Sequence, residues 1–159
     1  MKQKTKMWFE ELNKNFSGVE YNRHLCNRFP FLIPVDFFQT DEKRYIEIGY
    51  NYDYTWLDYV DIGWKTIFLE MCEEIQQVLE FEDIEFKILD IKEKYGEMRV
   101  YYAGGNDKIQ SIISNYTDMS KYICIECGAP AKYILSYWYR PYCKNCAPEN
   151  VTNDDLIEV

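Results

Sequence analysis

The sequence predicts an α+β protein in which a small antiparallel sheet packs with two or three helices, and a zinc ribbon follows at the C-terminus. Three patterns lead to this fold class: a long segment with apolar residues at helical spacing, an alternating segment typical of a β-hairpin, and two C-x2-C motifs. We therefore expect an α+β domain over residues 1–120, a zinc ribbon over 121–149 and a frayed acidic tail over 150–159.

Composition and charge are those of a folded, acidic protein. Of the 159 residues, 47% are hydrophobic and 18% are aromatic, which is enough to bury a core. The net charge of -9 disfavours broad contact with nucleic acid, because an acidic surface repels phosphates. We expect a cytoplasmic protein without a membrane segment, since no signal-peptide pattern and no run of ~18 apolar residues occurs.

The first sixty residues predict one helix, one extended segment and one strand. Apolar residues within 5–16 fall near helical spacing, and Ser17-Gly18 ends the pattern. Two closely spaced prolines exclude a regular helix from residues 20–43, so we expect an extended apolar segment there. Residues 44–50 alternate as a strand does, while 51–61 fit a loop, a strand or the start of a helix.

Two further helices are predicted in the second half of the α+β domain. From Trp64 onward, apolar residues recur with a period of 3.6 over four turns, and Asp61 is placed to cap this helix. The other helix is expected over about 107–119, with Asn106 or Asp107 as its cap.

Residues 84–102 predict a β-hairpin between these two helices. The alternation of apolar residues breaks at Leu89, which indicates either a bulge or burial on both faces of the strand. Gly96 supplies the positive φ that a tight turn needs.

Charged and aromatic side chains gather around this turn, and two interpretations of them remain open. They form a contact surface for an anionic partner, or they form solvated cross-strand ion pairs worth only ~0.2–1 kcal/mol each. The candidate binding residues at the hairpin tip are Lys92, Lys94, Tyr95, Arg99 and Tyr101.

Four cysteines predict a structural metal site. Cys124 and Cys127 form one C-x2-C pair, and Cys143 and Cys146 form a second pair after fifteen residues, which is typical of a zinc ribbon. Four thiolates close the tetrahedron around one Zn²⁺ and leave no position for a catalytic water, so a catalytic zinc or a redox pair is less favoured. Because so small a ribbon has almost no core, we expect chelation to unfold residues 122–147 and to spare the rest.

The predicted ribbon is mildly basic and rich in aromatic residues. Residues 121–149 carry four cations against two carboxylates, a local charge of +2 in a chain of -9. Aromatic side chains beside cations suit single-stranded nucleic acid. Trp138, Arg140 and Lys144 therefore join the candidate binding residues.

No catalytic residue is identified, and we expect a non-enzymatic protein. His24 is the only histidine, and it lies two residues from Cys26, a spacing at which side chains rarely face each other. No Gly-rich phosphate loop, Ser-His-Asp order or H-E-x-x-H motif occurs. Cys72 lies on the apolar stripe of the long helix and is expected to be buried as a small hydrophobic residue.

The hairpin and the first C-x2-C motif together resemble a set of small phage and prophage proteins of uncharacterised function. Their pattern reads approximately K-x-K-[FY]-G-x-[LM]-R-x-Y-Y, followed by a C-x2-C-G ribbon and preceded by a Gly-Trp helix start. Residues 92–102, Cys124–Gly128 and Gly63-Trp64 match it. The resemblance covers roughly residues 56–147, and the second C-x2-C pair departs from it, because the closing ligands vary. It implies a mobile-element origin and a setting in the cytoplasm of an infected host, and it implies no activity.

The sequence favours an accessory protein that binds a host macromolecule, a protein in the first place. An acidic body with abundant tyrosine and tryptophan favours this class. Inhibition of a host defence or nucleic-acid-handling protein, with the acidic body imitating nucleic acid, is a specific form of it. One alternative is a nucleic-acid-binding regulator that works through the ribbon and the hairpin tip. A second is an enzyme or a sequestering protein for an anionic small ligand.

Overall fold

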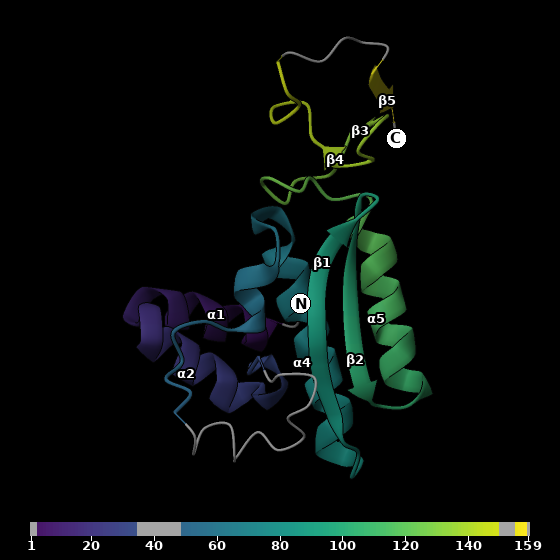
Figure 1. The fold of residues 1–159 in the computed structure, drawn as a ribbon. Coiled ribbons are helices and arrows are strands. Elements are labelled where there is room, and N and C mark those ends of the chain that lie inside the picture. The colour runs from purple at the N-terminus through teal and green to yellow at the C-terminus, as the bar shows by residue number, and fades with distance from the viewer. Residues whose placement is uncertain (1–2, 35–48, 150–154, 159) are drawn as a thin grey trace.

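The computed structural model describes residues 3–34, 49–149 and 155–158. These residues contain four α-helices, a two-stranded antiparallel sheet and a three-stranded antiparallel sheet (Figure 1). The α+β class is thereby confirmed, with a cluster of four cysteines near the C-terminus. We call the described part of residues 3–120 the body and the part that follows it the ribbon.

Two helices open the chain where one was predicted. Helix α1 (Gln3–Asn15) confirms the first prediction, and α2 (Gly18–Arg28) follows it. The extended segment expected from residue 20 is wrong over α2, because the helix ends before Pro30, which starts the short 3-10 turn Pro30–Leu32. Residues 35–43 of that segment, and most of the strand predicted at 44–50, lie outside the described residues.

The long helix α4 (Lys65–Phe81) confirms the clearest helical pattern. Two 3-10 turns precede it, η2 (Trp56–Tyr59) and η3 (Ile62–Trp64). Of the loop, strand or helix start predicted for residues 51–61, the structure has a loop that contains the 3-10 turn η2. A capping box between Thr55 and Asp58 starts this turn. The predicted side-chain cap at Asp61 is wrong: this residue takes part only through its carbonyl, which accepts from Trp64 N at 2.9 Å.

The predicted hairpin is strand β1 (Phe86–Lys94) paired with strand β2 (Glu97–Gly104). The register shifts between Ile88 and Asp90, which confirms the bulge at Leu89. At the tip, Tyr95 and Gly96 have φ values of 54° and 79°, and positive φ at both central residues is what a type I′ turn requires. Helix α5 (Asp107–Ser120) then begins with Asn106 as its cap.

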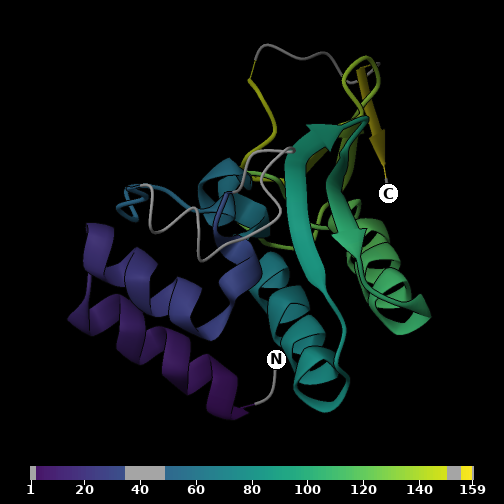
Figure 2. The same ribbon diagram turned by 60° about the horizontal axis from the view of Figure 1, so that its bottom comes forward.

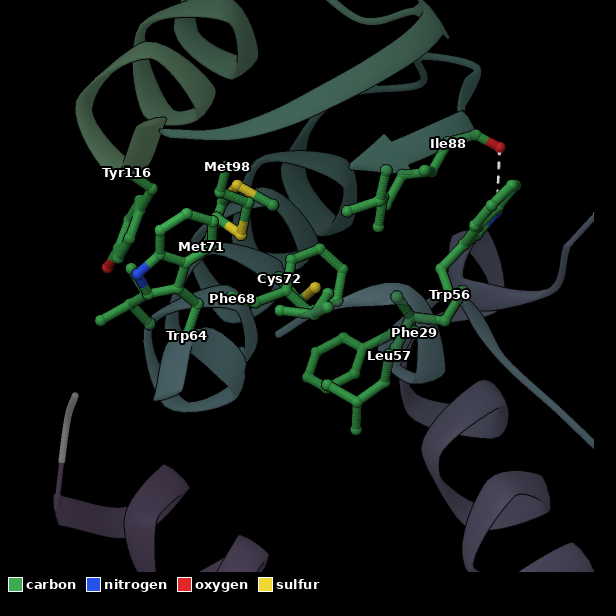
Figure 3. Packing of buried hydrophobic residues seen from close by; sticks show 14 of the residues in the cluster. Phe29, Trp56, Leu57, Trp64, Phe68, Met71, Cys72, Ile88, Met98 and Tyr116 are labelled. Atoms are coloured by element: carbon green, nitrogen blue, oxygen red, sulfur yellow. Dashed lines mark hydrogen bonds between the residues drawn. The ribbon is translucent and has the colours of Figure 1, made fainter. Parts of the chain in front are cut away.

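The core of the body lies between the hairpin and helices α4 and α5. Ile88 and Met98 of the strands belong to one buried cluster with Phe68 and Met71 of α4 (Figure 3). Helices α1 and α2 lie on the other side of α4 from α5 (Figure 2). No helix in the described part of the chain has the length and apolar content to cross a membrane.

The ribbon ends in a small sheet whose strands are β3 (Tyr133–Leu135), β4 (Pro141–Tyr142) and β5 (Leu156–Glu158), in the order β4-β3-β5. Strand β5 lies within the tail that the sequence predicts to be frayed over 150–159, of which the structure describes residues 155–158. Residues 156–158 pair with β3, and Ser136 N donates to Asp155 O at 2.8 Å. Figure 1 places this sheet beyond the end of the hairpin where β1 turns into β2.

Helix α5 closes the outer edge of β2 at Met98. The buried Ser120 accepts from Met98 N through its Oγ at 2.9 Å, and Thr117 Oγ1 donates to Met98 O at 3.0 Å. A third strand would supply both of these partners in a larger sheet. Two side chains of the last helical turn supply them here, so the backbone groups of Met98 are paired without a third strand.

Ser120→Ala is expected to lower the free energy of unfolding by ~1–3 kcal/mol, because it leaves the Met98 amide buried without an acceptor. Chemical denaturation measures this loss. Ser114→Ala on the exposed face of the same helix is the matched control, and its effect should stay within about 0.5 kcal/mol. Equal losses for the two variants would show that the Ser120 hydroxyl does not support the strand edge.

Candidate metal centre

The structure brings together all four predicted metal ligands. The Sγ atoms of Cys124, Cys127, Cys143 and Cys146 lie within 4.8 Å of one another, and those of Cys127 and Cys143 are 3.6 Å apart. Four sulfurs bound at about 2.3 Å around a tetrahedral ion would be about 3.8 Å apart. The cluster can therefore hold one metal ion, with a donor set that leaves no coordination position open.

The turn over residues 124–128, which we call the first knuckle, depends on glycine for two reasons. Gly128 has φ +77° and donates its N–H to Cys124 O at 2.9 Å, which closes the tight turn around the first pair of cysteines. A Cβ at Gly128 would also lie only 2.8 Å from Gly63 O in the body. A larger residue would thus meet both an unfavourable backbone conformation and the neighbouring segment.

The turn over residues 143–147, the second knuckle, is less constrained. Cys146 N and Ala147 N both donate to Cys143 O, at 3.2 and 3.1 Å. Ala147 stands where the first knuckle has Gly128, and it is not among the residues with positive φ. Alanine is therefore tolerated at this position, which explains why the two motifs differ in their fifth residue.

The four thiols differ in exposure and in acidity. Cys124 and Cys143 are buried, Cys146 is half-buried and Cys127 is exposed. Burial alone would raise the pKa of Cys143, but hydrogen bonds from the Asn145 backbone and from the Cys146 and Cys127 thiols lower it to about 7. Hydrogen bonds of the Cys146 thiol with Cys127 and Cys143 raise the pKa of Cys146. Because a metal binds the deprotonated thiolates, metal binding releases protons, and the affinity of the site for metal falls as the pH decreases.

The first knuckle is seated directly on the start of the long helix. Gly63 N donates to Ile125 O at 2.8 Å, and Trp64 Nε1 donates to Ile123 O at 2.9 Å. A Cβ on Gly63 would overlap the carbonyl oxygen of Cys124. Sequence reasoning treated Gly63 only as part of a helix start, and no local pattern reveals a partner about sixty residues further along the chain.

The hairpin tip forms a second contact with the ribbon. A Cβ on Gly96 would overlap Tyr139 O, and the rings of Tyr95 and Tyr139 lie edge to face at 6.4 Å. Glu93 accepts from Gly96 N at 2.8 Å and pairs with Arg140 at 3.3 Å. The carboxylate of Glu93 therefore joins the hairpin turn to the turn between β3 and β4.

Three of the predicted binding cations are occupied by carboxylates of the chain itself. Arg140 pairs with Glu93 across the contact just described, while Lys92 pairs with Asp90 and Arg99 with Glu97. The two hairpin pairs run along their strands rather than across them.

The remaining predicted binding residues lie on the surface. Lys94 lies over the ring of Tyr95 at 5.7 Å, and Lys92 lies over Tyr101 at 4.6 Å. Lys144 is exposed on the second knuckle, apart from the hairpin positions in the sequence. Trp138 precedes Tyr139, which contacts Tyr95 and Gly96 at the hairpin tip, so Trp138 and Tyr95 belong to two turns that meet.

Comparison with protein-family models, with curated proteins and with solved structures finds no match to this chain. The site is a closed set of four thiols on two short knuckles, and Gly63 N and the Trp64 indole bond the first knuckle to the body.

We expect the purified protein to carry one metal ion per chain, as measured by elemental analysis after gel filtration. Cys124→Ala and Cys143→Ala each remove one of the four ligands and should abolish tight binding. Cys26→Ala and Cys72→Ala are the controls, because these thiols are buried in the core of the body. Undiminished metal in Cys124→Ala, or its loss in Cys72→Ala, would place the ion elsewhere.

Proposed function

We propose that this chain is a non-enzymatic accessory protein of a phage or another mobile element, which holds one structural zinc ion and binds a host protein in the cytoplasm. Zinc is supported by the donor set, because soft thiolates in a tetrahedral cluster select it. The ribbon has short strands of two or three residues, so the ~10–16 kcal/mol that zinc binding contributes in finger peptides would be a large share of its folding free energy.

A cluster of exposed aromatic side chains carries the proposal of a protein partner. We call it the two-turn surface. It joins the hairpin turn to the turn between β3 and β4, and its members are Tyr95, Tyr137, Trp138 and Tyr139, exposed by 70%, 56%, 63% and 50%. Tyrosine and tryptophan are enriched among the residues that dominate binding energy at protein interfaces.

The two-turn surface is also held in place before any partner arrives. Tyr139 has φ +57° and its carbonyl oxygen lies against Gly96, while the neighbouring Arg140 is paired with Glu93. Contacts that order the backbone of this turn in the free protein lower the entropy cost of binding. A preformed aromatic surface is what a specific protein partner would use.

Charge favours a protein partner over nucleic acid. Glu158 lies in strand β5 of the ribbon sheet and Asp155 directly precedes this strand, and these two carboxylates offset the +2 of residues 121–149. The ion pair of Arg140 with Glu93 removes a further cation from any phosphate contact. The chain as a whole stays at -9, and so acidic a protein repels a polyanion.

The same acidity supports the more specific proposal of an inhibitor. Outside residues 121–149 the chain carries -11, since these residues contribute +2 to the total of -9. A host defence or nucleic-acid-handling protein presents a cationic groove, and a compact acidic body is complementary to it in charge. The two-turn surface would then supply apolar anchoring beside the electrostatic contact.

The proposal predicts that a host protein is captured from infected-cell lysate by the tagged wild-type chain and lost with the double variant Tyr137→Ala/Trp138→Ala. With the purified partner, this variant should bind about thirty-fold or more weakly, as the loss of ~2 kcal/mol typical of one hot-spot residue implies. Calorimetry or surface plasmon resonance measures the change.

Phe81→Ala is the matched control, because Phe81 is 88% exposed at the end of α4, and its partner binding should equal that of the wild type. Recovery of the same protein by the double variant would contradict the two-turn surface. Salt-sensitive binding of single-stranded oligonucleotides, lost in Lys94→Ala and Lys144→Ala, would instead establish the nucleic-acid alternative.

A further inference from the structure

We infer that metal binding in the ribbon is thermodynamically linked to the body through Gly63 and Trp64, so that the two-turn surface is complete only in the metal-bound protein. The linkage itself is a property of the free chain. Its consequence for partner binding rests on the proposed function.

Ile125, which lies between the first two ligands, is hydrogen-bonded to both the body and the ribbon. Ile125 is 2% exposed and belongs to the same buried cluster as the core of the body. Its carbonyl accepts from Gly63 N, and its own N–H donates to Pro141 O of β4 at 3.0 Å. Any rearrangement of the Cys124–Cys127 turn therefore disturbs a body contact and a ribbon contact at once.

Trp64 makes the second link. Its ring is 1% exposed, and its indole N–H donates to the carbonyl of Ile123, the residue before Cys124. The donor and its ring are buried in the body, whereas the acceptor moves with the knuckle. If the knuckle opened without its metal, a buried N–H would lose its partner, which is unfavourable. The body thus stabilises the metal-binding conformation of the knuckle.

Linkage of this kind is reciprocal. If the seated conformation of the knuckle favours metal binding, then metal binding favours the seated conformation by the same factor. Within the ribbon the knuckle is held by backbone hydrogen bonds from Cys124 N to Ala129 O at 2.7 Å and from Ile125 N to Pro141 O at 3.0 Å. The metal and the seat on Gly63 would add to these restraints on Cys124 and Cys127.

The hairpin tip extends the linkage to the two-turn surface. Gly96 and Glu93 hold the turn that carries Tyr139 and Arg140, and Ile125 is bonded to β4 immediately after that turn. Release of the knuckle would free both the ribbon turn and the hairpin turn. Chelation should then reach residues of the body, beyond the unfolding of 122–147 that the sequence predicts.

A matched pair of tryptophan variants tests the linkage. Trp64 donates its indole N–H to the ribbon, and Trp56 donates its own to Ile88 O within the body at 3.1 Å (Figure 3). Trp64→Phe and Trp56→Phe therefore make the same chemical change at two buried sites. Competition with a chromophoric chelator measures zinc affinity, and Trp64→Phe should lower it about ten-fold while Trp56→Phe leaves it unchanged. Equal affinities for the two variants would overturn the inference.

Hydrogen exchange on the full wild-type chain, with zinc and after chelation, tests the same linkage without a variant. We expect faster exchange in residues 61–64 and 93–97 as well as in the ribbon, with the interior of α4 still protected. Change confined to the ribbon, or loss of protection throughout α4, would overturn it. A chain that shows this pattern but captures no host protein would refute the proposed function and leave the linkage standing.

Discussion

The close backbone contact between Gly63 and the first knuckle is the constraint on which the position of the whole ribbon depends. A glycine is required on each side of it, because a Cβ at Gly63 or at Gly128 would meet the opposite backbone. The contact needs no large apolar interface, which a ribbon with so little core could not supply. It relies instead on the backbone hydrogen bond from Gly63 N to Ile125 O and on one from the buried indole of Trp64. The cysteine cluster is thus one end of a structure that continues into the body.

Hydrogen bonds with side chains also explain how a two-stranded sheet can lie at the centre of the body. Two-stranded hairpins are marginal on their own in water. Here α5 satisfies the outer edge of β2 at Met98, and Trp56 donates to Ile88 O on the other strand, beside the bulge. Side chains from helices and turns replace the missing strands: β1 packs against the 3-10 turns Pro30–Leu32 and η2, and β2 packs against α5. The hairpin tip is thereby positioned to meet the ribbon.

Elements defined by local patterns could be predicted from the sequence, and contacts between distant segments could not. The periodicity of α4, the alternation of the hairpin and the spacing of the cysteines each lie within one short window. Helix α2 was hidden because its apolar residues are few and two prolines follow it, and β5 because a strand of three residues has no pattern of its own. The contact between ribbon and body joins Trp64 to Ile123, 59 positions apart. The local sequence marks this contact only by the glycine at position 63.

The contacts of the charged residues change what the candidate binding cluster means. Lys92 and Arg99 are direct cross-strand partners, and like charges placed opposite each other destabilise a sheet. Each is offset by a carboxylate two positions away on its own strand, so the hairpin tolerates the pair without a ligand. Arg140 is likewise satisfied, and its ion pair holds two turns together. What these pairs leave at the tip is Lys94, which lies over the ring of Tyr95, and a group of exposed aromatic rings, on a protein whose net charge repels polyanions. The hydrophobic effect, rather than charge, is therefore the larger driving force available to a partner at this surface.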